Sequence, residues 1–310
     1  MKVAVIGAGK VGSAVVGDLM RVGSVSEIVL VSRDRYRAEG EVLDYQHTTS
    51  FTHYPCVDVR VGGYEDCAGA DLAVIAAGPS IQEGQTRTDL AAQNVQVLRE
   101  ILNGLGRVCP RCFLILVTNP VDVLTYAAWR LSERPRSLVI GTGTMIDTAR
   151  LIQSIASAYR IDPKNVFAYM LGEHGETSFA AWSMANICGL SLEEFGKLHV
   201  AARIDREREE LRAKQAGYEI LRRKGYTNHG IAAAVARLVI AIASDEKCIL
   251  PVSVPLEGEY GLRDTALSVP CVVGAGGVEK VLEFPLSLKE RRKLQASADH
   301  LAEAIARAGL

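Results

Sequence analysis

The 310-residue sequence lacks a long hydrophobic run, an excess of charge of one sign and a large share of aromatic residues. A membrane-spanning helix needs about 20 consecutive apolar residues, and the apolar runs here are shorter or interrupted. Lysine plus arginine number 35 and aspartate plus glutamate 36, which gives a formal net charge of −1. Because nucleic acids and anionic membranes attract concentrated positive charge, we expect no nucleic-acid and no membrane partner. Small molecules are the expected ligands.

A disulfide framework is not indicated either, because the seven cysteines are an odd number scattered over a long chain, which favours reduced thiols. Met1 leads directly into an apolar strand, so the sequence predicts no secretory signal and a cytoplasmic protein. Cys109 and Cys112 form a C-x-x-C pair that could serve redox or metal chemistry. A structural role is favoured, because no second pair stands at ligand spacing and an apolar strand follows directly.

The first half of the chain alternates apolar runs with helix-length segments. The runs are rich in β-branched residues and show little polar alternation, as expected for strands buried on both faces; they lie at 3–7, 27–32, 71–78, 113–120 and 137–143. Helical patterns at 88–104 and 121–131 lie between them. This alternation predicts a parallel, doubly wound sheet with right-handed crossovers.

The pattern changes after about residue 142. Helices are predicted at about 144–160, through 202–223 and at about 229–246, followed by short strands with Gly and Pro turns and a C-terminal helix. Acids and bases are interspersed over 203–212, which indicates a solvated helix face. The sequence therefore predicts an α/β fold: a Rossmann dinucleotide-binding domain at 1–141 and an α+β substrate domain at 142–310.

A glycine-rich turn follows the first strand. Gly7, Gly9 and Gly12 have G-x-G-x-x-G spacing between a strand and an apolar helix. The first glycine permits a tight turn, the second lets the backbone approach a pyrophosphate, and the third allows close helix packing. The helix N-terminus then faces the anion. Flavin, nicotinamide and nucleotide-sugar enzymes can all carry this pattern.

The end of the second strand indicates which dinucleotide is preferred. An acidic residue usually stands there and binds the adenosine ribose, but this chain has Ser32 and then Arg33. Serine removes the repulsion of a 2′-phosphate, and a guanidinium suits bidentate phosphate contact. We therefore expect NADP(H) in preference to NAD(H). The alternative is that Arg33 points to solvent and Ser32 or Asp34 binds the ribose of NAD.

Four further segments, at 82–94, 117–126, 141–150 and 171–178, carry the polar residues that suggest chemistry. Together with the glycine turn and "KGYT" at 224–227, they resemble the L-lactate and malate dehydrogenase family in order and spacing. The resemblance runs almost from end to end and is closest to the branch of lactate and L-2-hydroxyisocaproate dehydrogenases. It implies reversible hydride transfer between a nicotinamide cofactor and a 2-keto or 2-hydroxy acid.

The resemblance assigns roles that the chemistry explains. The proton of the reaction needs a group that titrates near neutrality, which fits His174, with Asp147 beside it to raise its pKa and fix its tautomer. Arg150, three residues after Asp147, offers a planar cation for the substrate carboxylate. Arg87 would enter with a lid and polarise the substrate carbonyl. Asn119 would contact nicotinamide and substrate, and its bond to Pro120 is open to either isomer.

By the same resemblance, further residues of the turn and the strand ends would contact the cofactor: Lys10, Val11, Ala77, Gly78, Asn94 and Thr118, in addition to Asn119.

Substrate specificity in the family depends on a lid position that here holds Ile81. Isoleucine cannot pair with a second carboxylate, so malate and oxaloacetate are disfavoured. Lactate remains possible, but an apolar lid residue better complements a larger aliphatic or aromatic side chain. A one-residue shift of the loop would bring Gln82 inward instead. Thr227, Gly230 and Ile231 would line the same region, and the small Gly230 is compatible with extra room.

Two competing functions remain at this point. An ordinary NAD-dependent L-lactate dehydrogenase is the conservative one, and a non-catalytic dinucleotide-binding protein is the other. The family forms dimers and tetramers, so a homodimer or homotetramer is expected. The positions where many bacterial relatives bind fructose 1,6-bisphosphate hold Ile152 and Phe167 here, so no activation by that compound is expected.

Overall fold

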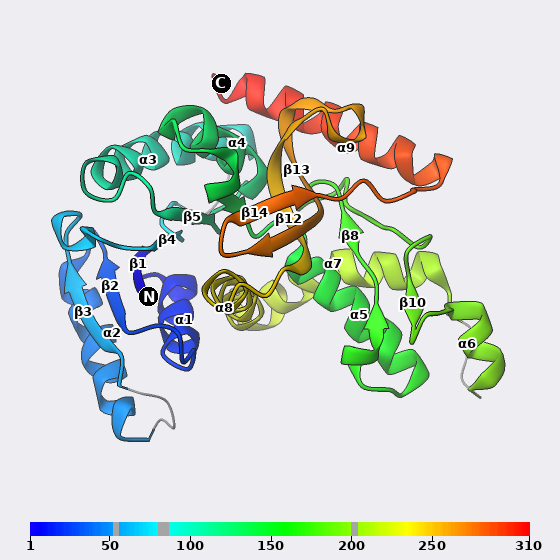
Figure 1. The fold of residues 1–310 in the computed structure, drawn as a ribbon, viewed down its shortest axis with the longest axis horizontal. Coiled ribbons are helices and arrows are strands. Elements are labelled where there is room, and N and C mark those ends of the chain that lie inside the picture. The colour runs from blue at the N-terminus through cyan, green and yellow to red at the C-terminus, as the bar shows by residue number, and fades with distance from the viewer. Residues whose placement is uncertain (52–55, 80–86, 200–203) are drawn as a thin grey trace.

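The protein is described by a computed structural model that covers residues 1–51, 56–79, 87–199 and 204–310, with only the backbone of 87–89. Figure 1 follows the chain through a sheet-based first half into a more helical region and then back to the same sheet. Among the described residues, no helix is long and apolar enough to cross a membrane.

The first half forms a parallel sheet. Its strands are β1 (Lys2–Ile6), β2 (Glu27–Val31), β3 (Asp58–Gly62), β4 (Leu72–Ile75), β5 (Phe113–Leu116) and β6 (Val139–Gly141). The helices that follow strands are α1 (Lys10–Leu19), α2 (Arg35–Thr48), α3 (Arg87–Val108) and α4 (Val121–Ser132). The strand order is β3-β2-β1-β4-β5-β6. The order reverses between β1 and β4, and ligands of such sheets bind beyond the carboxyl ends of the strands at that point.

The same sheet continues into an antiparallel part. It consists of β12 (Cys248–Glu257), β13 (Arg263–Gly274) and β14 (Gly277–Val281), and β12 meets β6 where Ser253 lies opposite Gly141. Pro251 of β12 lies opposite Pro270 of β13. Because proline has no backbone N–H, two facing prolines fit an antiparallel ladder only as a pair that exchanges no hydrogen bonds.

Helices and short strands make up the remainder of the second half. The helices are α5 (Met145–Tyr159), α6 (Leu192–Leu198), α7 (Arg206–Lys224), α8 (His229–Ala243) and α9 (Leu288–Arg307). The short strands are β7 (Val166–Phe167), β8 (Met170–Leu171), β9 (Phe179–Ala180), β10 (Asn186–Ile187) and β11 (Leu190–Ser191). Helices α5 and α7 pack on each other and share an apolar cluster that includes Leu151, Ile155 and Ala213.

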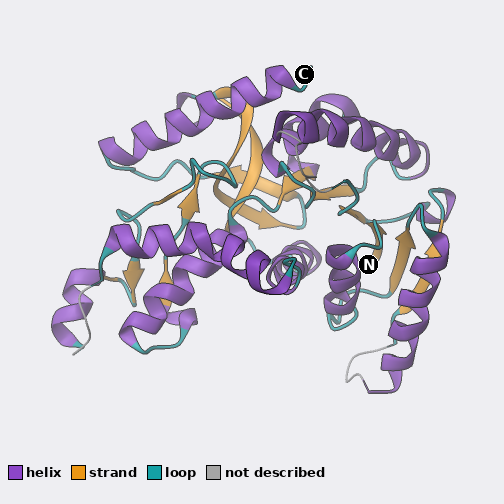
Figure 2. Cartoon of the chain, turned by 180° about the vertical axis from the view of Figure 1, so that it is seen from behind, coloured by secondary structure: helices purple, strands orange, loops and turns teal. Residues whose placement is uncertain are grey.

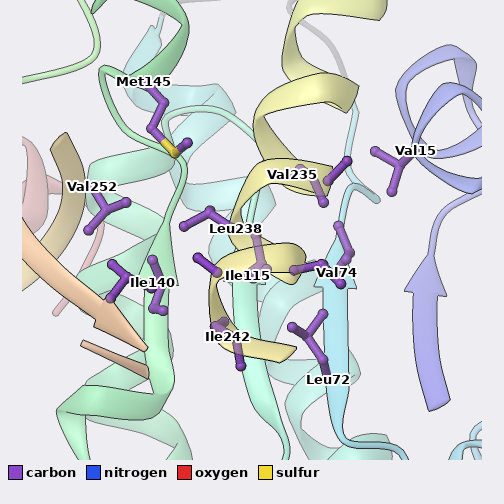
Figure 3. Packing of buried hydrophobic residues seen from close by; sticks show 14 of the residues in the cluster. Val15, Leu72, Val74, Ile115, Ile140, Met145, Val235, Leu238, Ile242 and Val252 are labelled. Carbon is purple, nitrogen blue, oxygen red and sulfur yellow. The ribbon is translucent and has the colours of Figure 1, made fainter. Parts of the chain in front are cut away.

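The main core lies on both faces of the sheet, as the helices on either side of the strands in Figure 2 show. Alternate residues of a strand point to opposite faces. Val3 and Val5 of β1 therefore join one cluster with α1 and α8, whereas Ala4 and Ile6 join another with α3 and α4. Figure 3 shows the first cluster, in which side chains of β4, β5 and β6 face those of α8.

The predicted fold class, a Rossmann doubly wound sheet followed by a part with helices and strands, is confirmed. Sequence reasoning missed β3, whose short run "DVRVG" mixes charged with apolar residues. It also expected short strands where the long hairpin of β12 and β13 stands. Helix α8 ends at Ala243 rather than near 246, and its apolar face is buried in the core. The boundary after residue 141 stays a prediction.

Replacing Ile115 with alanine tests the core between the sheet and α8. The side chain is fully buried, so we expect the free energy of unfolding to fall by about 2–5 kcal/mol in denaturant titrations. Ile220→Ala on α7 is the matched control; Ile220 is 41% exposed and should change the stability by about 0.5 kcal/mol or less. Equal effects of the two substitutions would contradict this description of the core.

Candidate active site

The glycine turn lies between β1 and α1, at the point where the strand order reverses. Gly7 has a φ of +115°, which favours glycine, and its amide donates a hydrogen bond to the Val31 carbonyl at 2.7 Å. A Cβ on Gly12 would lie 1.8 Å from the Gly7 carbonyl oxygen. A Cβ on Gly9 would meet nothing within 4 Å. The turn therefore has no room for a side chain at Gly12, whereas the space beside Gly9 is open. An open space at the helix N-terminus fits a pyrophosphate.

The ends of β4 and β5 meet beside this turn. Thr118 Oγ1 donates to the Ala77 carbonyl at 2.8 Å, and Asn94 Nδ2 donates to the Asn119 carbonyl at 2.7 Å. A Cβ on Gly78 would lie 2.5 Å from Asn94 Oδ1. That oxygen is buried and has no hydrogen-bond partner among the described residues. The structure therefore brings together the residues at which the sequence predicts cofactor contact.

The segment after β2 holds the residues on which the two hypotheses about the adenosine end of the cofactor depend. Asp34 caps α2, with its Oδ1 accepting the Arg37 N–H at 3.0 Å. Arg33 is exposed, and no described residue forms an ion pair or hydrogen bond with its side chain. Arg35, by contrast, pairs with Glu39 at 3.0 Å. Of the residues at this strand end, Arg33 is thus a cation without a partner among the described residues, whereas one Asp34 oxygen is occupied.

Tyr226 was not predicted at the nucleotide turn, but it lies there. Its ring stacks against Lys10 Nζ at 3.9 Å and Lys224 Nζ at 4.5 Å. These cation–π contacts join the start of α1 to the segment before α8, where Thr227 is half-buried. Val11, next to Lys10, is half-buried as well. The signal in the sequence was the aromatic residue of "KGYT", which only the fold places beside the glycine turn.

His174, Asp147 and Arg150 form the central cluster. Asp147 Oδ2 lies 2.5 Å from His174 Nδ1, and Asp147 Oδ1 accepts from Arg150 Nη1 at 2.9 Å. The Asp147 side chain is 7% exposed, that of Arg150 17% and that of His174 25%. Asp147 and Arg150 stand three residues apart in the first turns of α5 and so project from the same face. One carboxylate therefore bridges an imidazole and a guanidinium.

The ionisation of the cluster follows from these contacts. Burial opposes the charged form of His174, but the Asp147 carboxylate outweighs it and holds the pKa of the imidazole above its ordinary value. Burial likewise opposes the charge of Asp147, yet His174 and Arg150 together lower its pKa below the usual range. The Asp147 carboxylate also lies near the positive end of the α5 dipole. With Nδ1 facing Asp147, His174 Nε2 is the nitrogen left for a ligand.

Asp122 on α4 is a second acid at this site, and sequence reasoning missed it. Its Oδ2 accepts the His174 backbone N–H at 2.7 Å. Burial raises the pKa of Asp122 to about 6. The residue follows the Asn119–Pro120 bond, which is cis. A charged residue in the otherwise apolar run that follows the Asn-Pro pair was the available signal.

Two serines on distant elements hold the loops of the cluster. Ser268 of β13 accepts the Thr144 N–H at 2.9 Å through its Oγ, and its backbone exchanges two hydrogen bonds with Gly172. Ser297 of α9 accepts the Glu173 N–H at 2.7 Å. The start of α5 and the loop of His174 are therefore both attached to the C-terminal third of the chain.

A groove runs beside Arg150 between α5 and α7. Arg150 Nε is buried and lacks a hydrogen-bond partner among the described residues. A Cβ on Gly217 of α7 would lie 3.2 Å from Arg150 Nη2, so this glycine lets the helix pass close to the guanidinium. The extra room expected at Gly230 is absent, because Ile146 Cδ1 lies 2.6 Å from where a Cβ would stand.

The side chains of three predicted site residues lie outside the described part of the structure. Arg87 is the first residue of α3, with its backbone alone described. Ile81 and Gln82 lie outside the described residues. The predictions for their side chains stay predictions.

Comparison with known proteins matches both halves of the chain to one family. The model of the lactate/malate dehydrogenase NAD binding domain matches residues 1–141, and that of the lactate/malate dehydrogenase alpha/beta C-terminal domain matches residues 144–309.

Individual relatives cover nearly the whole chain. L-lactate dehydrogenase 2 of Clostridium acetobutylicum is 45% identical over 309 residues, which span 98% of this chain and 96% of that protein. An L-lactate dehydrogenase of Acetivibrio thermocellus is 44% identical, with the same shares covered. Among solved structures, the ligand-bound minor L-lactate dehydrogenase of Enterococcus mundtii has a TM-score of 0.94 at 35% identity, covering 98% of this chain and 97% of its own.

Replacing Asp147 with asparagine tests the electrostatics of the cluster. The variant keeps the burial of His174 but removes the negative charge, so the pKa of the imidazole should fall when its ring protons are titrated by NMR. Asp58→Asn on the exposed start of β3 is the control and should leave that pKa unchanged.

The sign of the stability effect follows from the raised pKa. The ion pair of His174 with Asp147 stabilises the native state fully at pH values below the pKa of histidine in the unfolded chain. This stabilisation is lost as the pH rises through the raised pKa of His174 in the native protein. The difference in unfolding free energy between wild type and Asp147→Asn should therefore shrink as the solution becomes alkaline. A difference that grew with rising pH would contradict the pairing.

Proposed function

This chain belongs to the lactate/malate dehydrogenase family and is a nicotinamide-dependent 2-hydroxy-acid oxidoreductase, for which we propose L-2-hydroxy monocarboxylic acids as substrates. The observation that carries the proposal is the Asp147 carboxylate shared between His174 and Arg150. A protein that only bound a dinucleotide would need no proton donor beside an anion-binding guanidinium. The relatives compared above are named L-lactate dehydrogenases, which supports the same substrate class.

His174 moves the proton of the reaction. A bound nicotinamide supplies or accepts the hydride at the carbon that bears the substrate oxygen. His174, protonated on Nε2, donates a proton to that oxygen during reduction and takes it back during oxidation. Asp147 keeps Nδ1 occupied, which fixes the tautomer and stabilises the imidazolium.

Arg150 orients the substrate through its carboxylate. One Nη1 hydrogen bond goes to Asp147, while the buried Nε has no partner among the described residues, so the guanidinium retains donors for a second carboxylate. Bidentate contact fixes the substrate in two directions, which a lysine could not do. Arg87, at the start of α3, is proposed to polarise the substrate carbonyl, and Asn119 to contact both nicotinamide and substrate.

The substrate side chain is proposed to lie against Ile81, Gln82 and Thr227. An apolar Ile81 disfavours a second carboxylate and favours a bulky apolar group. Ile146 Cδ1 lies where a side chain on residue 230 would stand, so the glycine makes room for Ile146. Ordinary lactate chemistry with NAD is the alternative, and the names of the relatives favour it.

NADP(H) is the proposed cofactor, held by the glycine turn and by the strand ends at residues 77–78, 94 and 118–119. Two observations support it: Arg33 is exposed and has no partner in the part of the chain that the structure describes, and Asp34 is engaged as a helix cap. Ser32 lies at the end of the strand and brings no negative charge to repel a 2′-phosphate.

Assembly, location and domain division complete the proposal. We infer a homodimer or homotetramer, since large apolar side chains such as Phe167 and Leu211 are 55% and 52% exposed.

All seven cysteines are unpaired thiols, which suits the cytoplasm. Residues 1–141 would bind the dinucleotide and 142–310 the substrate.

A panel of keto acids tests the reaction and its specificity. Pyruvate, 2-ketoisocaproate and phenylpyruvate should be reduced at least tenfold more efficiently, in kcat/KM, than oxaloacetate, whose second charge would be left unpaired. His174→Gln should lower kcat/KM by about 10²- to 10⁴-fold. His47→Gln on the exposed face of α2 is its control. A His174→Gln enzyme of full activity would overturn the assignment.

The ratio of kcat/KM with NADPH to that with NADH tests the cofactor. The wild type should favour NADPH, and Arg33→Ala should lower this ratio about tenfold or more, because a charge-assisted phosphate contact is lost. Arg21→Ala, which removes an exposed arginine of a different segment, should leave the ratio unchanged. A wild type that strongly prefers NADH would refute NADP(H) as the cofactor.

A further inference from the structure

Cys109 and Cys112 lie far from the reacting groups, between the end of α3 and the start of β5. Asn119 lies beyond the opposite end of β5. The four residues of that strand, Phe113–Leu116, are by themselves about 13 Å long. The two Sγ atoms are 3.4 Å apart, and both residues are buried, at 5% and 3% exposure. Pro110 and Arg111, which join them, are exposed, so the thiols lie directly beneath a surface turn.

Arg134 is buried against this pair. It is 4% exposed and donates to the Cys109 carbonyl at 2.9 Å and to the Cys112 carbonyl at 3.2 Å. Its Nη2 also lies 3.7 Å from Cys112 Sγ. Within the described part of the chain, no carboxylate forms an ion pair with Arg134. A buried guanidinium requires a counter-charge, and Cys112 is the group in contact that can supply one.

The two thiols are not equivalent. The hydrogen-bond contact with Cys109, together with the Arg134 charge, lowers the pKa of Cys112 below its ordinary value. The same contact, and burial, raise the pKa of Cys109. Cys109 follows the C-terminus of α3, where the helix dipole also disfavours an anion. Cys67 lies in the same apolar cluster, and burial is the largest cause that raises its pKa to about 11.

We propose that Cys109 and Cys112 are a peroxide-reactive pair, in which Arg134 holds Cys112 as the attacking thiolate and Cys109 closes a disulfide. The ligand class is a small hydroperoxide, with hydrogen peroxide as the simplest member. The nearness of the second thiol and the buried cation beside the first are the two observations that carry the assignment.

The chemistry balances in two steps. Cys112 Sγ attacks one peroxide oxygen, the O–O bond breaks, and hydroxide leaves and takes a proton to become water, which leaves a sulfenic acid on Cys112. Cys109 Sγ then attacks that sulfur, the S–O bond breaks, and a second water leaves with the Cys109 proton. Two thiols are oxidised to one disulfide, and hydrogen peroxide is reduced to two molecules of water.

Peroxide treatment of the reduced full-length enzyme tests the pair. After treatment, the protein is unfolded, remaining thiols are alkylated, and peptides are identified by mass spectrometry. We expect a Cys109–Cys112 disulfide, lighter than the dithiol by two hydrogen atoms and without alkyl label. In Cys109→Ser, dimedone should label Cys112, because its sulfenic acid has no thiol to resolve it. In Cys112→Ser, Cys109 should take no dimedone.

Variants of Arg134 test whether its charge activates the Cys112 thiolate or whether the closeness of the two thiols is enough for disulfide formation. Arg134→Met should slow disulfide formation about tenfold or more, because the thiolate loses its counter-ion, whereas Arg134→Lys should retain part of the rate. Cys67→Ser, a buried neighbour without contact to Arg134, should form the disulfide at the wild-type rate. Should Arg134→Met fail to fold, dimedone labelling of Cys109→Ser decides the question.

Two results would overturn the proposal. One is that Cys109 and Cys112 are still fully alkylated after peroxide treatment, although the exposed Cys56 and Cys188 have been oxidised. The other is dimedone labelling of Cys109 in Cys112→Ser together with an unlabelled Cys112 in Cys109→Ser, which would reverse the roles.

Discussion

The buried Asp147 carboxylate is the constraint on which the rest of the site depends. It carries one negative charge between an imidazole and a guanidinium, and each oxygen serves one of them. A buried carboxylate without partners would lose its charge, and a buried imidazolium or guanidinium without a counter-ion would be costly. The three side chains are therefore mutually required. The Asp147 charge raises the pKa of His174 above its ordinary value, and Arg150 Nε has no partner among the residues that the structure describes.

The geometry of this cluster depends on elements that are far apart in the sequence. Helix α5 supplies Asp147 and Arg150, but the loop of His174 is held from three sides. Asp122 on α4 binds its backbone, Ser268 on β13 pairs with Gly172, and Ser297 on α9 binds the neighbouring Glu173. The antiparallel hairpin and the last helix thus position residues that they do not themselves contribute, which is why the sheet continues beyond its dinucleotide-binding part.

The dinucleotide side follows a simpler rule. Parallel strands that end at one edge bring their following loops together, so the glycine turn, residues 77–78 and residues 118–119 meet at the reversal of strand order. That outcome could be predicted from strand and helix patterns alone.

The predictions from the sequence were wrong where local signals conflicted with the tertiary context. Prolines suggested short strands, yet Pro251 and Pro270 face each other within one long hairpin. The mixed run of β3 gave too weak an alternation to be recognised.

By itself, the sequence determined the parallel doubly wound sheet and the place of the glycine turn, because these depend on periodicity and on the spacing of glycines within single elements. The candidate catalytic residues came from the resemblance of whole segments to one family. Only the tertiary structure decided that Asp122 reaches the His174 backbone, that Tyr226 lies beside Lys10, that Ile146 fills the space at Gly230 and that Arg134 is buried against the two thiols. Each of these contacts joins elements separated along the chain, and the packing of whole helices and strands, rather than any local preference, brings their side chains together.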